Sequence, residues 1–348
     1  MSSRASVASR VTGARRLLVA AAAALTLGGG LLAGCGAGGA TVATTAPTVP
    51  SVTAVSTPTL PSSELPGSDR PIVTLGDMNT PEQFILGQLY QLALQNEGYT
   101  VELTRNAGPN PVRQKAVRNG TLDIYPDYLG QWNASVAHLH HRFQTLAASY
   151  GAASAYAHRH GFVLLNPTPF SNTSGLAVTA QYAQLNHISS IAGLARGPGI
   201  LLGAPPQFAT GPDGMRALMR AYHLHATQVN SDIGGLQYDK LDSGAVQAVW
   251  VNTTDQELDG THFRLLADPK HVFGFGNVVP VTTRKVLREE GPVFARTINR
   301  VDALLSTQAM RGLNAEEGNN VRNPTSVARQ FLQGAGILPP SRYAPAPT

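Results

Sequence analysis

PIVTLGDMNTPEQFILGQLYQLALQNEGYTVEL, residues 71–103, is the stretch of sequence that decides the fold. Residues 71–75 are mostly apolar and predict a buried strand. Thr80 followed by Pro81 is typical of a helix start, with threonine as the cap and proline at the first helical position. We expect the helix to end at Gly98, because glycine commonly follows the last helical residue. The stretch therefore predicts a strand followed directly by a helix.

The same alternation continues further along the chain. Residues 100–103 are expected to form a second strand, residues 111–119 a helix that ends at Gly120, and residues 122–125 a third strand. The order strand, helix, strand, helix, strand predicts an α/β domain with a largely parallel sheet.

A second α/β pattern begins after the polar segment 167–174. It is expected to contain strands at 176–179, 200–203 and 246–251, and helices at 213–222 and 238–243. From residue 277 onward the pattern shows one strand, at 278–281, and three helices, around 292–305, 307–313 and 325–332. These are too few strands for a third domain, so the last part of the chain is expected to return to the first.

We therefore predict two α/β lobes. The first lobe is expected to comprise residues 70–172 and 277–340, and the second lobe residues 173–276. Two crossings should link the lobes, near residues 170–174 and 275–279.

Residues 1–34 have the pattern of a secretory signal peptide. Four arginines and no carboxylate precede residue 35, and residues 17–32 form an apolar run that ends among small residues. The alternative is a transmembrane helix, but about 16 residues fall short of the roughly 20 that span a bilayer, and consecutive glycines weaken a helix. A cleaved signal is the favoured interpretation.

The signal ends in Leu32-Ala33-Gly34-Cys35, which resembles the lipobox of bacterial lipoproteins. In that motif the cysteine thiol is acylated and becomes the first residue of the mature chain. Cys35 is the only cysteine of the sequence, so it has no partner for an internal disulfide. The resemblance implies an extracytoplasmic protein anchored to the bacterial cell membrane by a lipid on Cys35.

Two further segments are expected to lie outside the folded lobes. Residues 35–69 are rich in Thr, Pro, Ser, Ala and Gly and contain no aromatic residue, so they cannot bury enough apolar surface to offset the entropy of ordering. They are expected to form a tether after the lipidated cysteine. Residues 341–348 are expected to form a disordered tail.

The charge of the chain does not indicate a nucleic-acid partner. The 348 residues carry a formal net charge of +5, but four arginines of this excess lie in the signal. Their removal leaves 22 basic residues against 21 acidic ones, which removes the electrostatic argument for nucleic acid. With 43% hydrophobic residues, the chain as a whole is globular rather than disordered.

Four stretches occur in the order found in one family of exported proteins: residues 76–83, 119–130, 207–214 and 236–241. The second, NGTLDIYPDYLG, resembles the Gly-x-Ile-Asp-x-Tyr-Pro-Glu-Tyr-Thr-Gly stretch of glycine betaine, choline, carnitine and proline binders from osmoprotectant uptake systems. The similarity covers about residues 72–334. The chain thus resembles a substrate-binding lipoprotein of an osmoprotectant ABC importer.

This resemblance implies a fold and a set of partners. The fold would be α/β and two-lobed, of the type II periplasmic-binding-protein kind, with the ligand cleft between the lobes. The ligand would be a small-molecule solute, either a quaternary ammonium or another polar or aromatic compound, and the partners would be ABC permease subunits. We expect no cofactor and no nucleic acid, and we expect a monomer.

The resemblance also implies a binding site. In the family, aromatic faces surround the quaternary ammonium, which cannot donate a hydrogen bond, and an arginine binds the carboxylate. On this chain the aromatic positions fall on Tyr128, Ser174, Asn252 and Gly276, and the arginine position falls on Gly211. Most of the cage is therefore replaced, which predicts a wider and more polar pocket, an altered ligand and weak binding of glycine betaine. The implied ligand-binding residues are Asp77, Met78, Tyr128, Asn172, Ser174, Asn252 and Gly276.

Other residue groups have a structural interpretation beside a functional one. Phe275, Trp132 or Trp250 could supply a displaced aromatic wall, although such residues more often belong to a core. The nearby histidines could suggest a metal site, but residues two apart point away from each other on a helix, and no cysteine or glutamate completes a ligand set. We therefore expect no metal at His138, His140 and His141.

The sequence leaves two classes of function open. The favoured one is a binding protein that closes on a solute and presents it to a permease. The alternative is a lipoprotein on the same scaffold that has lost transport and serves as a sensor or surface interaction module. An enzyme is the weakest interpretation, because the mature chain has no Gly-x-Ser-x-Gly or His-Glu-x-x-His motif and no general base and nucleophile can be paired.

Overall fold

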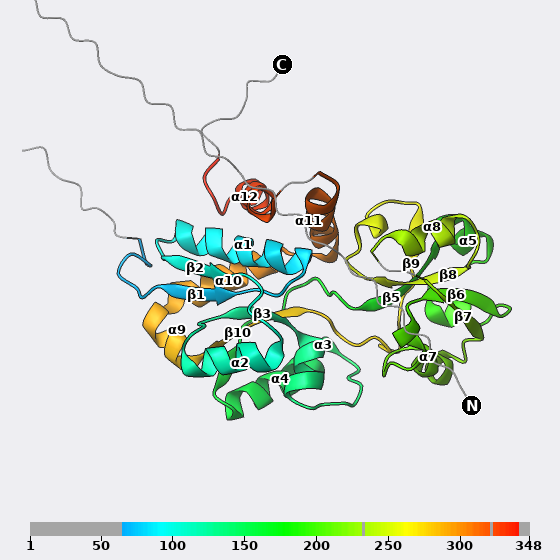
Figure 1. Ribbon diagram of the computed structural model, residues 1–348, viewed down its shortest axis with the longest axis horizontal. Coiled ribbons are helices and arrows are strands. Elements are labelled where there is room, and N and C mark those ends of the chain that lie inside the picture. The colour runs from blue at the N-terminus through cyan, green and yellow to red at the C-terminus, as the bar shows by residue number, and fades with distance from the viewer. Residues whose placement is uncertain (1–64, 232–233, 321–322, 341–348) are drawn as a thin grey trace, which may run out of the picture. The chain divides into compact units, whose positions relative to one another are not determined.

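Three sheets organise the part of the chain that the computed structural model describes, residues 65–231, 234–320 and 323–340. We call the part built on β1, β2, β3, β4 and β10 lobe 1, and the part built on β5 to β9 lobe 2 (Figure 1). The predicted signal peptide, Cys35, most of the predicted tether and the predicted tail at 341–348 lie outside the described residues.

β1 (Val73–Gly76) and β2 (Val101–Thr104) form a parallel pair joined by α1 (Pro81–Asn96). The strand and helix predicted from residues 71–98 are therefore confirmed. Thr80 occupies the cap position of α1, but its side chain makes no capping hydrogen bond. The chain leaves the helix through Gly98 at φ +90°, in the left-handed region that favours glycine.

The third strand of lobe 1 departs from the predicted parallel sheet. Ile124 makes a single parallel bridge with Leu75. The chain then continues into β3 (Tyr125–Tyr128), which runs antiparallel to β10 (Val278–Thr283). β10 also pairs with β4 (Phe162–Leu164), again antiparallel. Strand pairing in lobe 1 is thus mixed, because its later strands pair with a returning segment.

Lobe 2 contains one five-stranded sheet with the strand order β7-β6-β8-β5-β9. β6 is parallel to both β7 and β8, whereas β5 is antiparallel to β8 and β9. The strands are β5 (Ser174–Thr179), β6 (Ile200–Ala204), β7 (Ala226–Asn230), β8 (Ala248–Asn252) and β9 (Phe263–Leu265).

The remaining helices surround the sheets, and α12 packs on α1 instead of on a strand (Figure 1). They are α2 (Asn110–Asn119), α3 (Leu129–Gln131), α4 (Leu146–Arg159), α5 (Ala180–Leu185), α6 (Ile191–Leu194), α7 (Met215–Tyr222), α8 (Leu236–Asp242), α9 (Arg284–Glu290), α10 (Pro292–Leu304), α11 (Thr307–Asn320) and α12 (Pro324–Gly334). Short helical turns are η1 (Trp132–Val136), η2 (Pro206–Ala209) and η3 (Gln256–Leu258). None of the described helices combines the length and the apolar character needed to cross a membrane.

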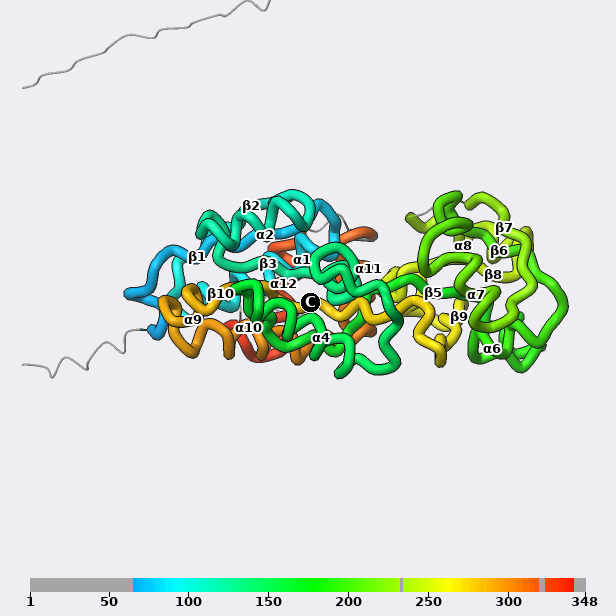
Figure 2. The backbone as a smooth tube through the Cα atoms, turned by 90° about the horizontal axis from the view of Figure 1, so that it is seen from below, coloured from blue at the N-terminus to red at the C-terminus, as the bar shows by residue number. Residues whose placement is uncertain are grey.

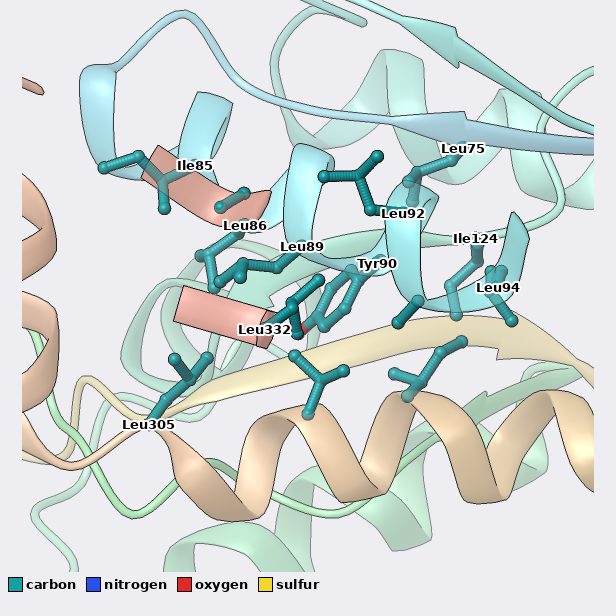
Figure 3. Close-up of a cluster of buried hydrophobic side chains, with 14 of the residues drawn as sticks. Leu75, Ile85, Leu86, Leu89, Tyr90, Leu92, Leu94, Ile124, Leu305 and Leu332 are labelled. Atoms are coloured by element: carbon teal, nitrogen blue, oxygen red, sulfur yellow. The ribbon is translucent and has the colours of Figure 1, made fainter. Parts of the chain in front are cut away.

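The main core of lobe 1 forms around α1. Leu86, Leu89 and Tyr90 of this helix are fully buried, and they lie near Leu305 and Leu332 (Figure 3). Helices from the end of the chain therefore cover a helix near its beginning.

Residues 65–69 are part of the folded lobe, although the sequence placed them in the tether. The amide of Gly67 donates to the carbonyl of Glu97 at 2.8 Å. A Cβ atom at Gly67 would lie 2.4 Å from the amide nitrogen of Tyr99, so the chain packs closely here. Ordered contacts thus begin before Arg70.

Two segments cross between the lobes and lie against each other (Figure 2). Ser171 and Asn277 form a bridge, the amide of Asn172 donates to the carbonyl of Gly276 at 3.0 Å, and the amide of Gly276 donates to Ser171 Oγ at 2.9 Å. A Cβ atom at Gly276 would lie 1.9 Å from the carbonyl oxygen of Asn172. Only glycine allows the two backbones to approach this closely.

α11 makes a further connection to lobe 2. Arg311 donates from Nε to the carbonyl of Thr253 at 2.9 Å and from its terminal nitrogen to the carbonyl of Leu258 at 3.1 Å. Asn314 Nδ2 donates to the carbonyl of Thr254 at 3.0 Å. Side chains from the C-terminal part of lobe 1 thereby hold the segment that follows β8.

Candidate functional site

A cleft of about 1110 Å³ opens where the two lobes meet. Its walls come from the start of α1, the end of β3, both crossings, the end of β8 and α11. This volume is slightly above the range of about 300–1,000 Å³ for pockets that hold drug-sized molecules. Six of the seven sequence-predicted ligand-binding residues line it: Met78, Tyr128, Asn172, Ser174, Asn252 and Gly276.

Asp77 is the exception, because it lies beneath the cleft and not in its wall. Its side chain is fully buried, and Oδ1 accepts a hydrogen bond from the amide of Asn106 at 2.6 Å. Arg105 Nε lies 3.9 Å from Oδ2. Burial raises the pKa of Asp77, and the Asn106 amide and Arg105 oppose this rise. Asp77 therefore fixes the loop after β1 rather than facing a ligand.

Glu82 is the polar centre of the cleft, and sequence reasoning missed it. It lies in the first turn of α1 and is 5% exposed. Its Oε1 accepts from Tyr128 Oη at 2.6 Å and from Asn172 Nδ2 at 2.9 Å. Its Oε2 accepts from Asn314 Nδ2 at 3.2 Å. One carboxylate thus joins α1, the end of β3, the first crossing and α11.

Tyr128 is held as a hydrogen-bond donor in this network. The side chain is 7% exposed. Burial, followed by the charge of Glu82, raises the pKa of Tyr128 well above its ordinary value. The hydroxyl therefore stays protonated and points to Glu82.

Ser174 and Asn252 form one wall of the cleft in lobe 2. They stand directly opposite each other in the antiparallel pair of β5 and β8. Below them, Asp255 Oδ2 accepts from the Asn252 amide and from Tyr238 Oη, both at 3.1 Å. Burial raises the pKa of Asp255 to about 6, although hydrogen bonds from Asn252 and Tyr238 oppose the rise. This wall presents hydroxyl, amide and carboxyl groups instead of aromatic rings.

The three candidate aromatic residues have different positions. Phe275 lines the main cleft beside the second crossing. Trp132 is fully buried and meets Phe162 edge to face at 5.6 Å between ring centroids, so it belongs to the core. Trp250 lines a side pocket of about 220 Å³ that shares Ser174 with the main cleft.

Gly211, the position of the family arginine, lies in the same side pocket and outside the wall of the main cleft. The neighbouring Pro212 and Asp213 line both cavities. Position 211 therefore lies beside the main cleft, in lobe 2.

The histidine-rich loop borders the cleft at another point. His140, His141 and Arg142 contribute to the lining, together with Asp213 from lobe 2. Burial raises the pKa of Asp213, and the charge of Arg142 partly offsets this effect. In the described part of the chain, no group of three or more His, Cys, Asp or Glu side chains is arranged to hold a metal ion.

Comparisons with known proteins agree with this architecture. Residues 71–334 match the family described as the substrate binding domain of ABC-type glycine betaine transport systems. The chain is 32% identical over 276 residues to a glycine-betaine-binding protein of Pseudomonas aeruginosa, which covers 76% of this chain and 88% of the relative. It is 27% identical to the glycine betaine-binding protein YehZ of Escherichia coli, covering 76% of this chain and 90% of that protein.

Solved structures show the same fold. A structure described as a glycine betaine/carnitine/choline ABC transporter superposes with a TM-score of 0.70 at 23% identity, covering 76% of this chain and 99% of that chain. The predicted two-lobed α/β fold of the type II periplasmic-binding-protein kind is confirmed. The relatives are binding proteins and not enzymes, so the prediction of a non-enzymatic protein is also confirmed. The chain belongs to the family of substrate-binding domains of ABC-type glycine betaine transport systems.

Proposed function

We propose that this protein is the extracytoplasmic solute-binding lipoprotein of an ABC importer and that its cleft takes a small polar solute other than glycine betaine. Family membership supports the role in import and the partnership with ABC permease subunits. The signal pattern and the Leu-Ala-Gly-Cys stretch support a lipid anchor at Cys35. In this proposal the protein delivers its solute by closing its lobes on it.

The observation that carries the altered ligand is the polar wall of the cleft. Of the four cage positions, only Tyr128 is aromatic, and its hydroxyl is engaged by Glu82. One aromatic face supplies about 0.5–2 kcal/mol of cation–π attraction, too little to hold a trimethylammonium alone. The side chains of Ser174 and Asn252 can accept hydrogen bonds from a solute. A trimethylammonium group has no N–H to donate to them.

We further propose Met78, Tyr128, Asn172, Ser174, Asn252 and Gly276 as ligand-contacting positions, with Phe275 as an aromatic wall. Their shared position in the cleft lining supports this assignment. Asp77 is assigned a supporting role, in keeping with its buried contacts.

Lobe boundaries near residues 172/173 and 276/277 are also part of the proposal. The bridge between Ser171 and Asn277, which pairs the two crossings, supports these boundaries. β5 begins at Ser174 and β10 begins at Val278, so each crossing ends where a sheet begins.

Calorimetry with glycine betaine tests the altered ligand. The wild-type protein should bind it weakly or not at all. A variant with Ser174→Tyr, Asn252→Tyr and Gly211→Arg should bind it more tightly, because it regains two aromatic faces and a cation for the carboxylate. Thr227→Tyr, on the exposed face of β7, is the control for an added tyrosine. Micromolar or tighter binding of glycine betaine by the wild type would contradict the proposal.

A further inference from the structure

Glu82 is a buried carboxylate in the cleft wall that has no cationic partner in the described chain. It is 5% exposed, and none of the ion pairs between described residues includes it. A buried charge is costly unless an opposite charge or strong hydrogen bonds compensate it. Lobe closure removes more water from this position and raises that cost. A cation brought by the solute would supply the missing compensation.

The groups around Glu82 are neutral donors. Tyr128 Oη, Asn172 Nδ2 and Asn314 Nδ2 all donate to its two oxygens. Each carboxylate oxygen accepts at least one of these hydrogen bonds. The three contacts come from separate elements, so they fix the carboxylate in position while leaving its charge unpaired.

Asn314 adds a second, independent observation. Its Nδ2 donates to Glu82 Oε2 and to the carbonyl of Thr254, and these two acceptors determine which end of the amide is the nitrogen. The remaining atom, Oδ1, is buried and has no hydrogen-bond partner. Asn314 lines the cleft. An acceptor without a hydrogen-bond partner thus lies on the residue that holds the carboxylate, and leaving a buried acceptor unpaired is unfavourable.

These features distinguish between two kinds of cation. A quaternary ammonium offers charge but no N–H group, so it would leave the Asn314 oxygen unpaired. A protonated amine or a guanidinium offers both a charge and donors. Carboxyl groups of Asp255, Glu257 and Glu317 also line the cleft, as do the guanidinium groups of Arg142 and Arg220.

We propose that Glu82 is the charge partner of the solute, and that the solute presents an N–H-bearing cation, an ammonium with free protons or a guanidinium, to Glu82 and Asn314. This inference rests on the proposed function and narrows its substrate class. It makes Glu82 a specificity-determining residue, with Tyr128 and Asn172 as positioning residues for its carboxylate.

Calorimetry of the full chain with two sets of probes tests the inference. The first set is ethanolamine, its N-methyl and N,N-dimethyl derivatives, and choline, in which methyl groups replace the N–H groups of the cation one at a time. The second is agmatine, which carries an ammonium and a guanidinium. The wild type should bind the N–H-bearing probes at least tenfold more tightly than choline. Glu82→Gln should remove this preference, whereas Glu102→Gln, an exposed carboxylate change on β2, should leave it unchanged.

A melting curve shows whether Glu82→Gln is folded. If it is not, Asn314→Ala takes its place and should weaken agmatine binding severalfold without changing choline binding. Tighter binding of choline than of ethanolamine, an unchanged preference in the folded Glu82→Gln variant, or no binding of any probe would overturn the inference.

The variant Ser174→Trp, whose larger side chain obstructs the cleft, distinguishes a wrong role for Glu82 from a wrong proposed function. A choline preference that is lost in Ser174→Trp contradicts only the role of Glu82, because the binding still occurs in the cleft. Probe binding that survives Ser174→Trp occurs elsewhere and contradicts both.

Discussion

Replacing Gly276 by alanine should destabilise the protein, although it adds only one methyl group. The added Cβ would lie 1.9 Å from the carbonyl oxygen of Asn172, and real Cβ contacts are essentially never shorter than 3.0 Å. The two crossings must therefore move apart by about 1 Å. Gly276 is not among the glycines with positive φ, so alanine can adopt its backbone conformation and the effect is steric.

The magnitude follows from the contacts that such a shift breaks. The hydrogen bonds from the Asn172 amide to Gly276 and from the Gly276 amide to Ser171 span the two crossings. Each contributes about 1 kcal/mol net, and forcing a methyl group into a tightly packed contact costs about 1–3 kcal/mol. A loss of roughly 3–5 kcal/mol corresponds to a decrease in Tm of roughly 6–20 °C for a protein of this size.

Differential scanning calorimetry measures this decrease directly. The matched control is Gly260→Ala, because Gly260 is exposed and a Cβ atom there would meet nothing within 4 Å. A Gly276→Ala protein that melts within 1–2 °C of the Gly260→Ala protein would refute the reasoning, given that each kcal/mol should move Tm by about 2–4 °C.

Two further outcomes are expected. Cys35→Ala should move the protein from the detergent phase to the aqueous phase in a phase-partition assay, because the lipid anchor is lost; partition of the wild type into the aqueous phase would contradict the anchor. Burial raises the pKa of Asp255 to about 6 in the folded protein, against an ordinary value of 3.8. Between about pH 4 and 6 the folded state therefore binds more protons than the unfolded state. The free energy of unfolding should fall by up to roughly 3 kcal/mol as the pH rises through this range. Asp255→Asn should remove this part of the decrease in urea unfolding, and an identical decrease in both proteins would show that Asp255 does not cause it.

Local sequence patterns predicted most of the helices and strands of the fold. Pro81 and Gly120 marked helix ends correctly, because proline and glycine act through their own backbone preferences. Pairing was harder to predict. The antiparallel pairing of β3 with β10 depends on a strand more than 150 residues later in the chain. β4 and β9 are three residues each, too short for a periodic signal.

The site shows the same limit. The family motif predicted that Tyr128, Ser174 and Asn252 share a site, and all three line one cleft, because the positions of a motif follow the scaffold. It could not reveal that Gly276 is held by a backbone contact and cannot accept a tyrosine. In the sequence, Glu82 is only an acidic residue in the first turn of a helix, where acidic residues are common for structural reasons. Its importance arises only when Asn172 and Asn314 meet it in space.

The contacts of α11 have a consequence for how the lobes can move. Arg311 and Asn314 hold the carbonyls of residues 253, 254 and 258, so this segment of lobe 2 would stay with lobe 1 while the rest of lobe 2 turns. The axis of rotation would then pass close to the segment, and Asn314 places Glu82 beside the same axis. A solute held at Glu82 would therefore lie close to the axis. Because displacement in a rotation grows with distance from the axis, a movement of a fraction of an ångström at Glu82 would correspond to a larger movement at the distant rim of lobe 2.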